Sequence, residues 1–126
     1  MKRVLFLMIV LLTAGMVSAQ QKEASITVVG DAVHNFGEIK QSDGDASHTF
    51  TVINNGELPL VISRVAAPCG CTTPEFPKEP IAPGKTGDIT VTYHTTGRPG
   101  PFNSTVSIYS NGSKGNYVLT VRGDVK

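Results

Sequence analysis

Short runs in which every second residue is apolar constrain the fold of this chain more than any other feature of its sequence. The runs cover residues 26–29, 34–39, 49–53, 60–63, 89–94, 105–109 and 117–122. A period of two places alternate side chains on opposite faces of a β-strand, and many of these residues are β-branched, as strands favour. After residue 19, no stretch has the apolar spacing of an amphipathic helix.

Turn-forming clusters separate these runs. Gly, Pro, Asn and Asp gather at residues 42–45, 54–57, 82–85, 98–100 and 111–115. Gly and Asn permit a positive φ, and Pro presets φ for a turn. About seven strands in about 100 residues is the size of an immunoglobulin-like (Ig-like) domain. We therefore predict an all-β protein, an Ig-like seven-stranded antiparallel β-sandwich, with an open Greek-key barrel as the alternative.

The alternation also predicts which side chains form the core, because one face of each strand should lie between two sheets. The residues predicted to be buried are Phe50, Val52, Leu60, Ile62, Ile89, Val91, Val106, Ile108, Leu119 and Val121. The residues predicted to face solvent are Thr51, Thr90, Thr92, Ser107 and Thr120.

The first nineteen residues have the parts of a secretory signal peptide. Lys2 and Arg3 begin it, residues 4–12 are unbroken apolar sequence, and small residues precede a cleavage point after Ala19. The apolar run is shorter than the about 20 residues that span a bilayer. We predict a signal peptide at residues 1–19 and one domain at residues 20–126. The mature protein should be soluble and exported, periplasmic or secreted, with no membrane span after cleavage.

The charge balance argues against nucleic acid as a partner. The chain has 11 basic and 10 acidic residues, and loss of Lys2 and Arg3 leaves 9 basic residues and a net charge of −1. A general nucleic-acid-binding surface needs an excess of Lys and Arg. We therefore expect no nucleic-acid partner.

Cys69 and Cys71 are the only cysteines, and one glycine separates them. A disulfide across so short a ring stabilises a fold by only about 1.5 kcal/mol, so we expect it to be dispensable for folding. A strained, easily reduced bridge favours thiol–disulfide exchange, whereas two thiolates favour Cu(I) binding. Packing of the sulfurs beneath Pro68 and Pro74 is the purely structural alternative. Zinc is not expected, because no second cysteine pair or closely spaced histidine pair is present.

The histidines give a weaker signal. His34, His48 and His94 lie in predicted strands, where a single histidine usually faces solvent or is hydrogen-bonded. His94 is the exception, because it ends the run at residues 89–94 and can approach a neighbouring loop. No acidic residue is predicted to orient a histidine, and Asp45 is interpreted as a turn residue. We predict no catalytic residues, no metal site and no cofactor.

Residues 66–83 contain five prolines and are predicted to run as an extended, stiff connection that cannot form a regular ladder of hydrogen bonds. Stiffness lowers the entropy lost on binding, which suits a recognition surface. In that case Phe76 is the apolar anchor, and Glu75 and Lys78 are part of its charged rim. The alternative is a simple crossover between the two sheets.

Several short motifs, taken in order, resemble a family of exported bacterial proteins known as domain of unknown function 1573. The matching pieces include Phe36-Gly37, Asn54-Asn55-Gly56, Cys69-Gly70-Cys71-Thr72, Pro83-Gly84 and Ser110-Asn111. The resemblance implies an Ig-like sandwich, similar to modules of cilium- and sperm-type cytoskeletal proteins, and implies no reaction. We expect an exported, non-enzymatic module that binds another envelope protein. Thiol–disulfide exchange or Cu(I) binding through Cys69 and Cys71 is the alternative function.

Overall fold

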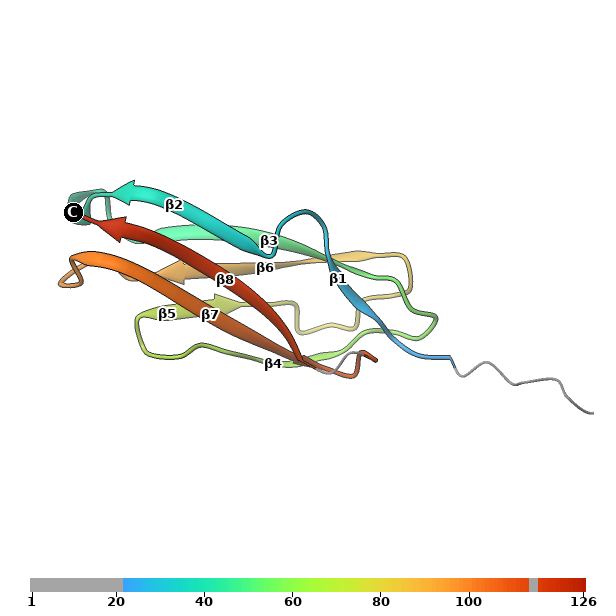
Figure 1. The fold of residues 1–126 in the computed structure, drawn as a ribbon. Helices are drawn as coiled ribbons and strands as arrows, with labels where there is room; N and C mark the ends of the chain where they lie inside the picture. The colour runs from blue at the N-terminus through green and yellow to red at the C-terminus, as the bar shows by residue number, and fades with distance from the viewer. Residues whose placement is uncertain (1–21, 114–115) are drawn as a thin grey trace, which may run out of the picture.

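The computed structural model describes residues 22–113 and 116–126, which form two four-stranded β-sheets (Figure 1). The strands are β1 (Ile26–Val28), β2 (Val33–Ile39), β3 (Ala46–Asn54), β4 (Ile62–Ala66), β5 (Thr72–Glu75), β6 (Thr86–Tyr93), β7 (Gly100–Ser110) and β8 (Asn116–Val125). A short 3-10 helix, η1 (Gln41–Asp43), follows β2. The strand orders are β1-β3-β6-β5 and β2-β8-β7-β4.

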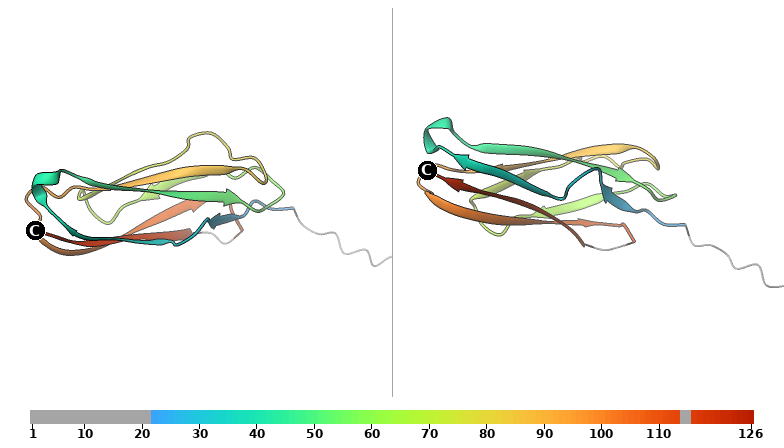
Figure 2. Two further views of the ribbon diagram at one scale, coloured as in Figure 1. Left: turned by 90° about the horizontal axis from the view of Figure 1, so that it is seen from above. Right: turned by 45° about the horizontal axis from the view of Figure 1, so that its top comes forward.

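The predicted β-sandwich is confirmed. The two sheets lie face to face as separate layers and do not close into a barrel (Figure 2). The residues that the structure describes form eight strands rather than seven, and β2 runs parallel to β8 instead of antiparallel. Five strands, β3 to β7, lie between β2 and β8 in the sequence, which gives the chain the length that a parallel return requires.

Strand β5 lies in the segment that the sequence predicts to be an irregular connection, and for residues 72–75 that prediction was wrong. Thr73 pairs with Thr92 of β6, and the carbonyl of Cys71 accepts a hydrogen bond of 2.8 Å from the N–H of His94. In an antiparallel ladder, every second residue directs its backbone N–H and C=O toward the neighbouring strand, so the nitrogen of Pro74 points away from β6. Because β5 is an edge strand, the N–H that Pro74 lacks costs no hydrogen bond.

The core follows the predicted alternation. All ten residues predicted to be buried are buried, and the residues predicted to face solvent are partly exposed. On that outer face hydroxyl groups pair across strands, as between Thr49 and Thr90 at 3.0 Å. The apolar and polar faces of each strand therefore separate the interior of the sandwich from its surface.

The buried side chain of Asn54 connects the loops at the end of the sandwich where β3 ends. Its Nδ2 donates to the carbonyls of Leu58 and Ile81, at 2.7 and 2.9 Å. Its Oδ1 accepts from the backbone N–H groups of Ser25 and Gly56, at 3.3 and 2.9 Å. One amide thus joins three segments: the start of the domain, the β3–β4 turn and the β5–β6 connection.

Truncation of a core residue should cost far more stability than truncation of its exposed neighbour. Leu119→Ala is expected to lower the free energy of unfolding by about 2 to 5 kcal/mol, because it leaves a cavity between the sheets. Val118→Ala is the matched control, because Val118 is 48% exposed, and it should change stability by no more than about 0.5 kcal/mol. Urea unfolding measures both, and equal losses would contradict the assigned faces of β8.

Candidate functional site

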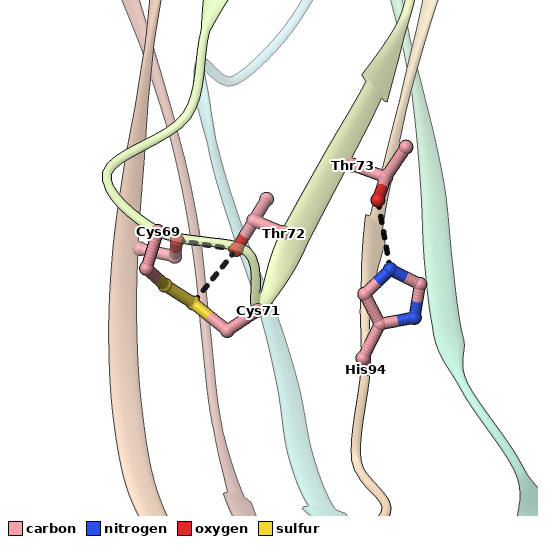
Figure 3. The surroundings of a disulfide bond; sticks show 6 residues. Cys69, Cys71, Thr72, Thr73 and His94 are labelled. Atoms are coloured by element: carbon pink, nitrogen blue, oxygen red, sulfur yellow. Dashed lines mark hydrogen bonds between the residues drawn. A yellow bond between two sulfur atoms is a disulfide. The ribbon is translucent and has the colours of Figure 1, made fainter.

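The candidate site lies where the β4–β5 connection enters β5. A disulfide joins Cys69 to Cys71, whose Cα atoms are 5.2 Å apart (Figure 3). Cys69 and Gly70 are exposed, whereas Cys71 is only 8% exposed. The bridge therefore has one residue at the surface and one in the interior.

Cys71 belongs to a small apolar cluster that is distinct from the main core. The cluster contains buried Tyr93 and Val125, with Ile39 and Phe102 packed against them. The rings of Tyr93 and Phe102 are stacked, with centroids 3.7 Å apart. These residues come from five strands or their ends, so the position of the Cys71 sulfur depends on the packing of both sheets.

Two buried hydroxyl groups form a short chain that ends at the sulfur of Cys71. The Oγ1 of Thr72 is 3.6 Å from this sulfur and 2.7 Å from the Oγ of Ser104 on β7. Thr72 and Ser104 are each 4% exposed. A hydroxyl can donate one hydrogen bond and accept others, so the order Ser104, Thr72, Cys71 forms a short relay that ends at the sulfur.

A second polar network lies on the opposite face of β5 (Figure 3). The Nδ1 of His94 is 2.9 Å from the Oδ2 of Asp45, and its Nε2 is 2.7 Å from the Oγ1 of Thr73. A carboxylate only accepts, so Nδ1 carries the proton, and in the neutral ring Nε2 accepts from the Thr73 hydroxyl. The other carboxylate oxygen of Asp45 accepts from the N–H of Thr95 at 3.3 Å.

The network of Asp45, His94 and Thr73 contradicts one prediction from the sequence and confirms another. The prediction that no acidic residue orients a histidine was wrong, because Asp45 lies 49 residues from His94 and meets it only when β3 pairs with β6. The approach of His94 to a neighbouring loop is confirmed. The hydrogen bond from His94 is the largest cause that lowers the pKa of Asp45, and the N–H of Thr95 adds to it while burial opposes it.

The arrangement Asp45, His94, Thr73 has the order of an acid–histidine–hydroxyl relay, yet it lies on an open surface. The side chains of His94 and Asp45 are 38% and 43% exposed. A hollow of about 340 Å³ lies elsewhere, beside Gly37 and Phe102, and the relay does not line it. Such a relay has catalytic value in a site that excludes water, so here we assign it the task of fixing β5 to β6 and to the start of β3.

His34 and His48 lie outside the candidate site. Their rings are stacked at 3.7 Å between β2 and β3, and each also meets a phenylalanine edge-on, Phe36 and Phe50 respectively. Burial, and then the charge of His34, lowers the pKa of His48. This pair joins the two sheets at one side of the sandwich.

The residues predicted to bind a partner lie together at the other end of β5. Phe76 is half-buried against the main core, and the Nζ of Lys78 is 4.0 Å from the centre of its ring. Glu75 ends β5 and is exposed, as is Lys78. At about 3.3 Å per residue, Glu75 and Cys71 are about 13 Å apart along the strand.

Within the described ranges, no group of three or more His, Cys, Asp or Glu side chains is placed to hold a metal ion. In the disulfide, Cys69 and Cys71 have no thiolate to offer Cu(I), so copper binding requires the reduced form. No helix among the same residues is long and apolar enough to cross a membrane.

Comparison with known proteins places the chain in a family. A family model described as "Protein of unknown function (DUF1573)" matches residues 15–125. The chain belongs to the DUF1573 family. No curated protein matches this DUF1573 chain.

Solved structures show the same fold at low sequence identity. A protein of unknown function from Porphyromonas gingivalis W83 has a TM-score of 0.71 and 12% identity over 87% of the DUF1573 chain, which spans 51% of that protein. The ASH/PapD-like domain 7 of human CEP192 has a TM-score of 0.67 and 7% identity, with 88% of this chain and 93% of that chain covered. The YadV chaperone has a TM-score of 0.60 and 13% identity, with 81% and 52% covered.

Sequence analysis missed four polar residues of this DUF1573 site, namely Asp45, Thr72, Thr73 and Ser104. Thr72 was visible only as the last letter of the Cys-Gly-Cys-Thr motif. The alternation of inward and outward side chains along β5 could have predicted that Thr72 is buried and Thr73 exposed. This strand was not predicted from the sequence, because Pro74 argues against one. Asp45 and Ser104 join the site through strand pairing, which a single sequence does not specify.

Removal of the His94 ring should raise the pKa of Asp45 toward its ordinary value, because the hydrogen bond that favours the carboxylate is lost. Carboxyl titration by NMR measures this in His94→Ala. A lowered pKa stabilises the fold above the unfolded-state value, and this contribution disappears as pH falls through the folded-state pKa. The variant should therefore lose less stability on acidification than the parent.

Asp43→Asn, in the same loop, is the control and should leave the Asp45 titration in place. An Asp45 pKa that is identical in His94→Ala and in the parent protein would refute the assigned hydrogen bond.

Proposed function

We propose that this DUF1573 protein is an exported, non-enzymatic Ig-like module that binds another envelope protein through the β5 surface. The β5 surface is defined as the exposed and half-buried residues from Cys69 to Lys78. The observation that carries the proposal is that this surface is exposed, yet its conformation is fixed at three points by contacts with the rest of the domain.

The three fixed points are distributed along the β5 surface. The disulfide and the apolar cluster around Cys71 hold its beginning. The hydrogen bond from Thr73 to His94 holds its middle, and Phe76 holds its end by packing on the core. A surface ordered before binding loses less conformational entropy when a partner docks, which favours recognition.

The chemistry of the β5 surface suits a protein partner. Phe76 provides apolar area, and Glu75 and Lys78 provide opposite charges at its edge. Charged groups at the rim of an interface set orientation and exclude wrong partners more than they add affinity. Likeness of the fold to a PapD-like domain of human CEP192 and to the YadV chaperone gives further support for a protein partner.

Charge reversal at the rim should weaken partner capture without unfolding the domain. Lys78→Glu is expected to reduce capture of cross-linked envelope proteins by about tenfold, because it removes the positive charge of the rim and adds a third acidic side chain to Glu75 and Glu79. Arg122→Glu, on exposed β8 of the other sheet, is the charge-matched control and should capture as the parent does. Capture that both variants lose equally, or that neither loses, would exclude the β5 surface as the interface.

Export has its own test. The protein recovered from its native cells should begin at Gln20, because the small residues before Ala19 direct cleavage there. N-terminal sequencing of the protein from fractionated cells measures this. Recovery of the chain in the cytoplasm with its first residues intact would contradict export.

A further inference from the structure

We infer that the Cys69–Cys71 disulfide oxidises thiols of a partner, with Cys69 as the attacked sulfur and Cys71 as the leaving group. The substrate class is a pair of neighbouring cysteine thiols at an exposed site of another protein. This activity goes beyond the proposed binding function, because it rests on the chemistry of the disulfide and the Ser104–Thr72 relay, whereas binding uses the disulfide only to order the β5 surface.

Access determines which sulfur is attacked. Cys69 is exposed together with Pro68 and Gly70, so a thiolate on a large partner can approach it. Cys71 packs with Tyr93 in the interior and is closed to such an approach. Exchange requires a thiolate to reach the sulfur in line with the bond that breaks, and accessibility therefore selects Cys69.

The hydroxyl relay determines which sulfur leaves. The hydroxyl of Thr72 lies 3.6 Å from the Cys71 sulfur and is itself 2.7 Å from the hydroxyl of Ser104. With Ser104 donating to Thr72 and Thr72 donating to sulfur, the relay stabilises negative charge that develops on Cys71. Burial opposes a thiolate at this position, so the hydroxyl supplies the compensation that lets the sulfur depart.

The reaction balances as a two-electron transfer. A partner thiolate attacks the Cys69 sulfur and forms a mixed disulfide, while the Cys69–Cys71 bond breaks and its electron pair passes to Cys71. Cys71 then takes a proton from water. A second partner thiolate attacks the partner's own sulfur in the mixed disulfide, which forms a disulfide in the partner and releases Cys69 as a thiolate. The partner loses two electrons, and Cys69 and Cys71 gain them.

His94 takes no part in this chemistry, although it is adjacent in the fold. Its ring lies on the opposite face of β5 from the disulfide and is occupied by Asp45 and Thr73 (Figure 3). Its backbone N–H only anchors the carbonyl of Cys71. The exchange therefore uses Thr72, on the inner face of the strand, and leaves Thr73 to its structural hydrogen bond.

Reduced glutathione serves as the probe thiol for the test. The oxidised full chain is mixed with glutathione, quenched with acid at successive times and mapped by peptide mass spectrometry. We expect the first adduct on Cys69, followed by the dithiol. Thr72→Val should slow reduction by about fivefold or more, because it keeps the side-chain shape and removes the hydroxyl. Thr72→Ser restores a hydroxyl and should restore the rate, which a purely structural role would not do.

Ser104→Ala is the second variant and should also slow the reaction, because it removes the donor behind Thr72. A first adduct on Cys71, a disulfide that glutathione does not reduce, or equal rates in Thr72→Val and the parent would overturn the inference. Capture of a partner by Cys69→Ser/Cys71→Ser, still sensitive to Lys78→Glu, would show that binding does not need the disulfide, so that binding stands even if glutathione fails to reduce the parent protein.

Discussion

The packing of two apolar sheet faces against each other determines where the other structural features of this molecule lie. Because each strand turns alternate residues inward, the burial of Val91 and Leu119 requires their neighbours to lie outside. The same rule applies to β5, where Thr72 faces the interior and Thr73 the solvent. One four-residue strand thus carries two separate polar networks, one against the disulfide and one against His94.

The two ends of the sandwich are closed by different interactions, hydrogen bonds at one end and apolar packing at the other. At the end near the N-terminal strand, the amide of Asn54 joins loops through four hydrogen bonds to backbone groups. At the other end, the stacked rings of Tyr93 and Phe102 cover the interior beneath Cys71. A buried amide whose groups are all paired is expensive to replace, because its backbone partners would be left without hydrogen bonds. At the end with the cluster, the disulfide has one exposed residue, Cys69.

The proposed binding and the proposed thiol–disulfide exchange both use the β5 edge of the molecule. The rim at Glu75 and Lys78 and the turn at Cys69 belong to the same exposed segment, separated by the length of β5. A partner held at the rim would present its own residues to the disulfide at high effective concentration. Because Pro74 removes a donor from the free edge of β5, the segment resists pairing with a foreign strand, so the proposed recognition relies on side chains rather than on the backbone.

The sequence by itself determined the fold class, the core and the turns, because strand alternation and turn chemistry are local properties that neighbouring residues encode. It also singled out Cys69, Cys71 and His94 as the residues to watch. Only the tertiary structure decided that β2 runs parallel to β8 and that β5 exists as an edge strand despite Pro74. Tertiary pairing likewise brought Asp45 to His94, and Ser104 to Thr72, across tens of residues. Such contacts depend on which strands become neighbours, and that choice is made by packing two whole sheets together rather than by any short stretch of sequence.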